Sequence, residues 1–457
     1  MGRKVLTAKS GRAACSCAAA GGEIAAKNAK SAESLTQKHK GTEKMKSSGN
    51  PWIGDVPEGW EVRRLRYLAE ITTGNKDTQD AQPDGNYPFY VRSPVIERSN
   101  EYTFEGPGIM MAGDGAGAGR IFHYADGKYA VHQRVYRIYD FKDVTAYFLL
   151  YFLGAMFPLE MDKGSAQSTV PSVRLPMLRD LQVSLPPLPV QRAIAAYLDE
   201  KCAAIDGAVE ELKRGIEDCK AWKKAIITEV TSVGLDDDLK LWQTELGWIS
   251  NRPSYWKRNQ LSSLCRRGIT YGIVKLGEPC ENGVKVLRCS DVKDGYLDAS
   301  NVRTVTPELS DEYKRTVLSG GEVIVNVRGT LGGCAIVPKE FSGANIAREV
   351  ALLDVEESKA NPKFVMYTLL SSCFANYVGH EMAGAIYQGL NIATLSKYSF
   401  YAPDIKEQQA IADYLDEKCA AIDALVAEKE KLIADLEAYK KSLIFELVTG
   451  KKEVKQK

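Results

Sequence analysis

The stretch QRAIAAYLDEKCAAID, from Gln191 to Asp206, recurs as QQAIADYLDEKCAAID from Gln408 to Asp423. Fourteen of the sixteen positions are identical, and the copies lie 217 residues apart in a chain of 457 residues. A period this long exceeds that of any solenoid repeat, and two copies are too few for a solenoid. The repeat therefore predicts a duplicated whole unit, in which one globular segment is followed by one long helix.

Apolar residues continue from each copy at the spacing of a long amphipathic helix. In the first copy they step by fours and threes for more than four heptads, and Lys223 occupies the only gap in this seam. The second copy keeps the spacing but is broken at Lys429 and at Lys440, the equivalent of Lys223. A helix from about Leu188 to Ser232 would be about 65 Å long. The predicted seam comprises Leu198, Cys202, Ile205, Val209, Leu212, Ile216, Leu415, Cys419, Ile422, Val426, Ile433 and Leu436.

Each helix needs a partner, because a single helix of this length cannot bury its apolar seam within its own domain. The other helix is the obvious candidate. If a pseudo-twofold relates the duplicated units, the two helices must pair antiparallel, as a coiled-coil spacer with a domain at each end. Gly234 and Gly450 stand where the helices should stop. The alternative, two unrelated amphipathic helices packed into separate cores, is disfavoured by the identity of the copies.

The globular segments carry weaker signs of duplication. WIGDVPEGWEVRRL, from Trp52, aligns with WISNRPSYWKRNQL, from Trp248, and each header has two tryptophans eight residues apart. The expected role of these tryptophans is to anchor each domain to a helix end by hydrophobic contact, rather than to stack on bases. They are Trp52, Trp60, Trp248 and Trp256.

Beyond the headers, each segment predicts a strand, a glycine loop and a second strand. The first such run is GIMMAGDGAGAGRIFH, from Gly108, and the second is EVIVNVRGTLGGCAIVP, from Glu322. Short helices are predicted over 144–157 and 362–377. The predicted fold class is therefore mixed α/β (α+β), with two domains that have small mixed sheets and are separated by the two long helices.

The repeated phrases and the first header resemble the specificity (S) subunits of Type I restriction-modification systems. LPPLPVQRAIAAYLDEKCAAIDGAVEEL, KEQQAIADYLDEKCAAIDALVAEKEKLI and AYKKSLIFELVTGK are similar to that family's helical signatures, as is WIGDVPEGWEV to its header. The resemblance covers the chain from about Met45 to Lys451, and its specificity is high because two signatures recur in the correct order.

The resemblance implies a non-catalytic subunit with two target-recognition domains, each of which reads one half of a split double-stranded DNA site. The helices would set the gap between the halves and dock two DNA-methyltransferase subunits, with motor-nuclease subunits joining for cleavage. It implies no cofactor for this chain and S-adenosylmethionine, ATP and Mg²⁺ for its partners. The expected location is the cytoplasm, which suits ten cysteines that include no CxxC pair.

The predicted division of the chain follows the repeat. It comprises a basic extension (1–44), a first target-recognition domain (45–185), a central helical region (186–235), a second target-recognition domain (236–402), a C-terminal helical region (403–450) and a tail (451–457).

Residues 1–44 contain nine Lys or Arg and three Glu, and few apolar residues. Disorder is the expectation for such a composition. The segment would act as a basic arm that grips phosphate, or would be an expendable tail. MKSSGNPWIGDVPEGWEV resembles a typical start of the family, so Met45 is hypothesised to be the original start. N-terminal sequencing that finds Met1 or Gly2 in the native protein would contradict this.

Candidate DNA-reading residues gather beside the glycine loops. Arg and Lys suit guanine, Asn and Gln suit adenine, and carboxylates suit cytosine. The cluster is a stronger candidate than any one member, because most polar loop residues face solvent or cap the backbone. The candidates are Asn75, Lys76, Arg92, Ser93, Asp114, Arg120, His132, Gln133 and Arg134 in the first domain, and Tyr271, Lys275, Arg288, Ser290, Asp291, Arg328, Thr330, Asn345 and Arg348 in the second.

Other functions find little support. Neither glycine loop carries a full GxGxxG fingerprint, no GxxxxGK(S/T) loop is present, and four scattered histidines suggest neither a catalytic dyad nor a zinc site. A net charge of +1 is low for a solitary DNA-binding protein, so partner subunits are expected to supply much of the phosphate contact. The second hypothesis is a scaffold whose duplicated domains bind proteins, with the basic loops incidental.

Overall fold

The computed structural model describes residues 44–164, 171–236, 238–329, 331–382 and 389–454. The predicted basic extension, apart from Lys44, and the last residues of the tail lie outside these ranges. The chain divides into two compact units, of which unit 1 combines Met1–Gly207 with Asp435–Lys457 and unit 2 is Ala208–Ala434. Within the described ranges, no helix combines the length and the apolar character that a membrane crossing requires.

Both long helices are present at the predicted places. Helix α4 spans Leu188–Val233 and helix α9 spans Ile405–Val448. Gly234 and Gly450 follow the helices with φ angles of 86° and 72°. This left-handed conformation suits glycine and stops a helix. The predicted lengths and ends of both helices are confirmed.

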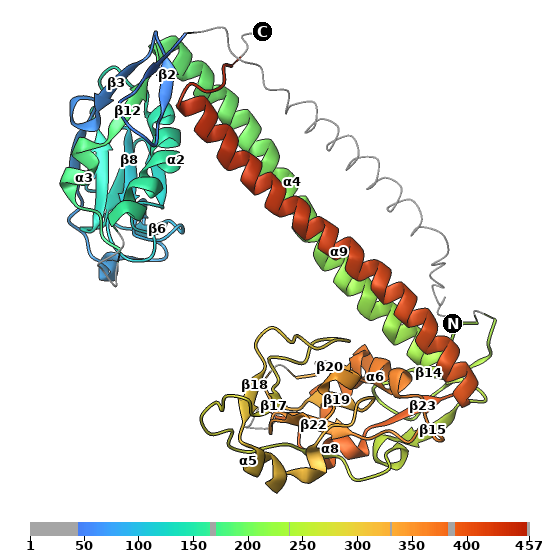
Figure 1. The fold of residues 1–457 in the computed structure, drawn as a ribbon. Coiled ribbons are helices and arrows are strands. Elements are labelled where there is room, and N and C mark those ends of the chain that lie inside the picture. Colours follow the sequence, from blue (N-terminus) through green and yellow to red (C-terminus); the bar gives the residue numbers. More distant parts are fainter. Residues whose placement is uncertain (1–43, 165–170, 237, 330, 383–388, 455–457) are drawn as a thin grey trace. The chain divides into compact units, whose positions relative to one another are not determined.

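Each unit contains the start of one long helix and the end of the other, and the two segments pack antiparallel. In unit 1, the start of α4 lies beside the end of α9 (Figure 1), and Leu198 of α4 shares a core with Leu443 and Leu447 of α9. In unit 2, Ile227 and Val230 near the end of α4 share a core with Leu415 near the start of α9. Most predicted seam residues are buried, and the half-buried ones are Leu212, Val426, Ile433 and Leu436.

Two of the three lysines that interrupt the seam, Lys440 and Lys223, pair with the acid that ends each repeated stretch. In unit 1, Lys440 Nζ donates to both carboxylate oxygens of Asp206 at 2.6 Å. In unit 2, Lys223 Nζ donates to those of Asp423 at 2.8 and 2.7 Å. The lysine side chains are only 29% and 19% exposed, so their stems cover the seam while their charges are neutralised. The gap in the apolar pattern is therefore filled by an interhelical ion pair in each unit.

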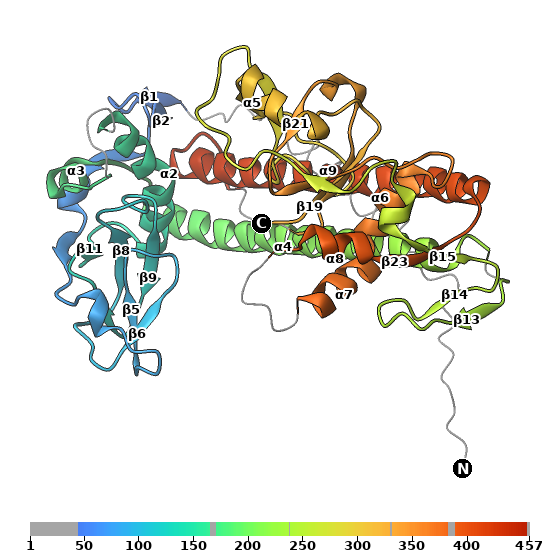
Figure 2. The same ribbon diagram turned by 90° about the horizontal axis from the view of Figure 1, so that it is seen from below.

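The globular part of unit 1 contains two four-stranded sheets, ordered β6-β5-β10-β7 and β4-β11-β8-β9, and two-stranded pairs β1-β2 and β12-β3. Helix α2 (Ala146–Gly164) packs on β8 and β9 (Figure 2), and α3 (Leu175–Asp180) precedes β12. The strands are β1 (Met45–Ser47), β2 (Asp55–Pro57), β3 (Glu61–Arg64), β4 (Glu70–Thr73), β5 (Tyr87–Tyr90), β6 (Glu97–Ser99), β7 (Phe104–Glu105), β8 (Gly108–Ala112), β9 (Phe122–Ala125), β10 (Lys128–Val131), β11 (Val135–Tyr139) and β12 (Gln182–Leu185).

Unit 2 repeats this plan, with sheets β16-β22-β19-β20 and β18-β17-β21 and pairs β13-β14 and β15-β23. Its helices are α5 (Pro307–Glu312), α6 (Pro362–Leu370), α7 (Ser372–Glu381) and α8 (Ile392–Lys397). Its strands are β13 (Leu241–Gln243), β14 (Asn251–Pro253), β15 (Lys257–Gln260), β16 (Thr270–Tyr271), β17 (Val284–Leu287), β18 (Arg303–Val305), β19 (Val323–Asn326), β20 (Cys334–Ile336), β21 (Asn345–Ile346), β22 (Val350–Leu353) and β23 (Ser399–Ala402).

The predicted fold class and the two strand–glycine loop–strand motifs are confirmed. In unit 1 the loop joins β8 to β9, and in unit 2 it joins β19 to β20. The helix predicted over 362–377 is instead two helices, because Ser371 has an extended backbone and its hydroxyl accepts a hydrogen bond from Phe374 N as the cap of α7.

The tryptophan headers anchor their domains as predicted, except at Trp52. Trp60 is buried beside Gly450, and Trp256 is buried beside Gly234, so each lies against the end of a long helix. Trp248 Nε1 donates to Ser399 O of β23 at 2.9 Å. Trp52 is 40% exposed, so the anchor role predicted for this residue is not borne out by its burial.

A glutamine in each repeated stretch joins the long helix to its globular domain. Gln191 is fully buried, its Oε1 accepts from Thr145 N at 2.7 Å, and its Nε2 donates to the carbonyls of Asp143 and Pro186 at 2.9 Å. Gln408 in unit 2 accepts from Asn361 N and donates to Pro403 O, both at 2.9 Å. The first residue of the repeat therefore fixes the start of each helix to the segment before the domain's own helix.

We expect Gln191→Ala to lower the free energy of unfolding by about 1–3 kcal/mol, because buried backbone groups would lose their hydrogen-bond partners. Urea denaturation measures this loss, and hydrogen exchange should show faster exchange at Thr145 N. The matched control is Arg192→Ala, which removes the exposed neighbouring side chain. Equal stability of the two variants would contradict the anchoring role.

Candidate nucleic-acid interface

In unit 1, most of the predicted DNA-reading residues come together at the ends of neighbouring strands. Arg92 follows β5, Asp114 follows β8, and residues 132–134 join β10 to β11. Lys76 forms a parallel bridge with His132, which brings a fourth segment to the same place. Segments that are far apart in the sequence thus form one surface, because β5 pairs with β10 and β8 pairs with β11, the two strands that residues 132–134 connect.

Asp114 is the centre of this cluster. Its Oδ1 accepts from Arg92 Nη1 at 2.8 Å, and its Oδ2 accepts from Arg134 Nη1 at 2.7 Å. Burial by itself would raise the pKa of Asp114, but the hydrogen bonds and charges of Arg134 and Arg92 outweigh it and hold the pKa below the ordinary value. The carboxylate is therefore ionised at neutral pH and bound to both arginines.

His132 lies buried beneath the cluster. Its Nδ1 accepts from Arg134 N at 3.0 Å, and its Nε2 faces Thr78 Oγ1 at 3.4 Å and Asp77 Oδ1 at 3.5 Å. Burial, together with the charge of Arg92, lowers the pKa of His132. A neutral ring with its proton on Nε2 satisfies these contacts. His132 therefore supports the loop from within and does not reach its outer face.

The remaining candidates of the first domain divide between surface and support. Gln133 is exposed and its Nε2 donates to Asp77 Oδ2 at 3.0 Å. Asn75 is exposed, and Lys76 Nζ pairs with Glu101 at 2.5 Å. Ser93 Oγ accepts from Val95 N within its own turn. Arg120 is not part of the cluster's hydrogen-bond network, because it pairs with Asp162 of α2.

Unit 2 builds a cluster at the same topological position. Arg288 follows β17, Arg328 follows β19, and Arg348 lies between β21 and β22. Arg348 N donates to Ile273 O at 2.9 Å, which places the segment of Tyr271 and Lys275 beside it. Tyr271, Lys275 and Ser290 are exposed.

Two candidates of the second domain are interior supports. Asn345 is fully buried, where its Oδ1 accepts from Thr316 Oγ1 at 2.7 Å and from Ile346 N at 2.9 Å. Asp291 is buried and holds Arg288 through both carboxylate oxygens. Thr330 lies outside the described residues.

The strand pairings match the two clusters residue by residue. Val135, the first residue of β11, pairs with Ala112 in unit 1, and Val350, the first residue of β22, pairs with Asn326 in unit 2. The backbone contacts agree, because Gly113 N donates to Arg134 O as Val327 N donates to Glu349 O. Asp114 therefore corresponds to Arg328 and Arg134 to Glu349. The charges at these two positions are inverted between the domains.

Two residues of the clusters escaped sequence reasoning. Asp77 accepts from Gln133 and faces His132, and Glu349 stands at the position equivalent to Arg134. Asp77 follows two predicted residues directly, and Glu349 follows the predicted Arg348. Their position next to predicted residues was the only signal in the sequence. Their roles depend on strand pairings that the sequence does not show.

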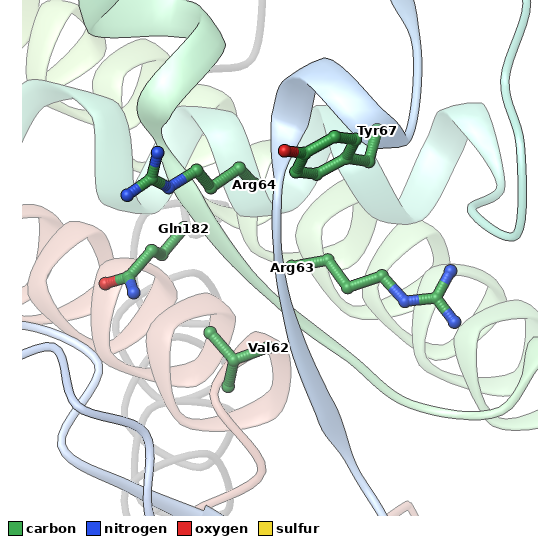
Figure 3. A pocket seen from close by; sticks show the side chains of 5 residues that line it. All are labelled: Val62, Arg63, Arg64, Tyr67 and Gln182. Carbon is green, nitrogen blue, oxygen red and sulfur yellow. The ribbon is translucent and has the colours of Figure 1, made fainter.

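A shallow pocket in unit 1 lies apart from the cluster, on the β3-β12 pair (Figure 3). Val62, Arg63, Arg64, Tyr67 and Gln182 line it. Its arginines are engaged in exposed ion pairs, Arg63 with Glu61 and Asp143, and Arg64 with Asp180, which also binds Arg66. This basic group therefore fits a solvated face of the domain.

Two segments of the chain, residues 57–214 and 253–435, match the family model of the Type I restriction modification DNA specificity domain. The Type I restriction enzyme MjaVIII specificity subunit of Methanocaldococcus jannaschii is 25% identical over 427 residues, which are 88% of this chain and 94% of that protein. The Type I restriction enzyme EcoDI specificity subunit of Escherichia coli is 22% identical over 416 residues, 87% of this chain and 89% of that protein.

A solved structure described for complex assembly and conformational transition of the type I R-M system contains a chain with a similar fold. The TM-score is 0.63 at 16% identity, over 86% of this chain and 98% of that chain. The two segments that match the family model agree with the two duplicated units of the structure. The chain belongs to the Type I restriction-modification DNA specificity family, as a specificity subunit with two target-recognition domains.

We expect acid to destabilise unit 1 through His132. Because burial lowers its folded-state pKa, the unfolded chain, whose histidine titrates near pH 6.5, takes up a proton first as the pH falls. Stability should therefore decline from about pH 7 toward pH 5. His132→Asn should flatten this part of the profile in urea denaturation, whereas His380→Asn, which alters an exposed histidine, should not. An unchanged slope in His132→Asn would refute the assignment.

Proposed function

We propose that each target-recognition domain reads one half of a bipartite, asymmetric DNA site, the first through residues 45–185 and the second through 236–402. One observation carries the proposal. The two domains place polar clusters on the same strand ends, yet fill equivalent positions with different and partly inverted charges. Equivalent loops with different side chains suit two half-sites of different sequence.

The reading surface proposed for each domain consists of the candidates that reach solvent. Arginine and lysine match guanine, and asparagine and glutamine match adenine. The buried candidates His132, Asn345 and Asp291 hold the loops in place instead. The surface comprises Asn75, Arg92, Gln133 and Arg134 in the first domain, and Tyr271, Lys275, Arg288, Ser290, Arg328 and Arg348 in the second.

The helices α4 and α9 would set the spacing between the half-sites and dock two methyltransferase subunits. The support is the repeated stretch, which offers nearly identical outer surfaces on the two helices. Motor-nuclease subunits would join the same complex for cleavage. The partner subunits would bring S-adenosylmethionine, ATP and Mg²⁺, while this chain contributes positioning and no reaction of its own. A protein-binding scaffold would leave the two polar clusters without a role.

Methylation mapping tests the proposal. DNA from cells that express this chain with its candidate methyltransferase subunit should carry adenine methylation in one split, asymmetric motif on both strands. Cells that lack only this chain should lose that motif. If no motif appears while the same methyltransferase is active with another specificity subunit, the DNA-reading proposal fails.

The spacing role predicts a second result. A seven-residue insertion after Leu212, matched by one after Ile433, preserves the heptad pattern in both helices. At 1.5 Å per helical residue against about 3.4 Å per base pair, the preferred gap should grow by about three base pairs, with unchanged half-sites. Mapping of the methylated motif measures the gap, and replacing seven residues at the same positions by equivalent heptads is the control. A constant gap would contradict the spacing role.

A further inference from the structure

The carboxylate near the start of the first glycine loop is bound through both oxygens and is largely shielded from a base. Both oxygens of Asp114 accept from guanidinium groups, one from Arg92 and one from Arg134. The side chain of Asp114 is only 17% exposed, whereas those of Arg92 and Arg134 are 40% and 62% exposed. An acid that reads cytosine must offer a free oxygen to the amino group of the base. Asp114 therefore acts beneath the surface.

The two arginines retain most of their donors. Each guanidinium has five N–H groups in a fixed plane. Arg92 and Arg134 each donate to Asp114 through Nη1, and no other side-chain hydrogen bond joins either guanidinium to the described residues. The bond to the carboxylate restrains the two flexible side chains before DNA arrives, which lowers the ordering cost on binding. Two restrained, adjacent guanidinium groups are the chemistry that recognises guanine through O6 and N7.

Resting on the proposed function, we propose that Asp114 is a positioning residue that orients Arg92 and Arg134 to read guanine in the half-site of the first domain. The proposal assigns a base class to this surface and separates the carboxylate that positions from the arginines that read.

The second domain lacks this device at the equivalent place. Arg328 stands where Asp114 does, and Glu349 stands where Arg134 does. Cys289, the second residue beyond β17, stands where Arg92 does, two residues beyond β5. Among the described residues, the pair of arginines on a shared acid therefore occupies this loop position in the first domain and not in the second, so the guanine that it reads belongs to the first half-site.

The test compares variants of the full chain in cells that express it with its candidate methyltransferase subunit. Arg134→Lys keeps the charge but loses the planar fork. It should lower the preference for one G·C pair of the first half-site by roughly 5- to 150-fold, the range for one bidentate contact. Asp114→Asn should relax the same base pair, by a smaller factor, since an amide has no charge and its NH₂ group cannot replace the second oxygen that accepts from an arginine.

The matched control is Asp180→Asn. Asp180 is likewise shared by two arginines, Arg64 and Arg66, but Arg64 lines the pocket on the β3-β12 pair (Figure 3), apart from the cluster. This variant should leave every base preference unchanged. Binding of purified full chain to duplexes with single base-pair changes gives a second measurement that does not depend on methylation.

The outcomes separate this proposal from the proposed function. A first half-site without any G·C pair, or full preference retained in Arg134→Lys, overturns the guanine assignment while a split motif upholds DNA reading. Relaxation in Arg134→Lys with none in folded Asp114→Asn overturns the positioning role. Equal weakening on all duplexes by Arg134→Ala, with a salt slope lower by about one, identifies a phosphate contact and overturns the assignment as well. Absence of any split motif removes both proposals together.

Discussion

The burial of one apolar seam against another is the constraint on which the rest of the structure depends. A helix of 46 residues exposes an apolar stripe far longer than one domain can cover. Each unit solves this by pairing the start of one helix with the end of the other. The ion pairs Lys440–Asp206 and Lys223–Asp423 each fill a position where the apolar pattern of a seam fails. Their acids belong to the repeated stretch, so the repeat encodes both the apolar surface and the charge that closes it.

The repeated stretch also explains how a variable domain is held by a constant helix. Gln191 and Gln408, at its first position, bind backbone groups of the adjoining domain. Further along, Tyr151 donates to Asp199 at 2.6 Å, and Tyr367 donates to Asp416 at 2.7 Å. Backbone amides and carbonyls are available whatever the side chains are. Anchoring mainly through them leaves the loops of each domain free to differ in sequence.

Periodic and repeated features were predictable, and long-range pairings were not. The helices follow from apolar spacing over many heptads, and the glycine loops follow from apolar runs on both sides, since both signals are local. The sequence could not show which of the polar candidate residues are buried and which are exposed. Asn345 and His132 are reader-like by residue type, yet both lie in the interior, because strand pairing turns them inward. Trp52 has the same residue type as Trp60, but it is exposed, whereas Trp60 is buried beside the end of α9.

The inverted charges beside the glycine loops show that the same backbone structure accepts different side chains in the two domains. Gly113 N donates to Arg134 O, and Val327 N donates to Glu349 O, so the backbone at this point is the same in both domains. At the two positions involved, one domain has Asp114 and Arg134 and the other has Arg328 and Glu349. Each combination carries one acid and one base, so exchanging the signs leaves the local charge balanced while it changes the groups offered to solvent. A constant backbone with interchangeable charges can thus present different chemistry without a change of fold.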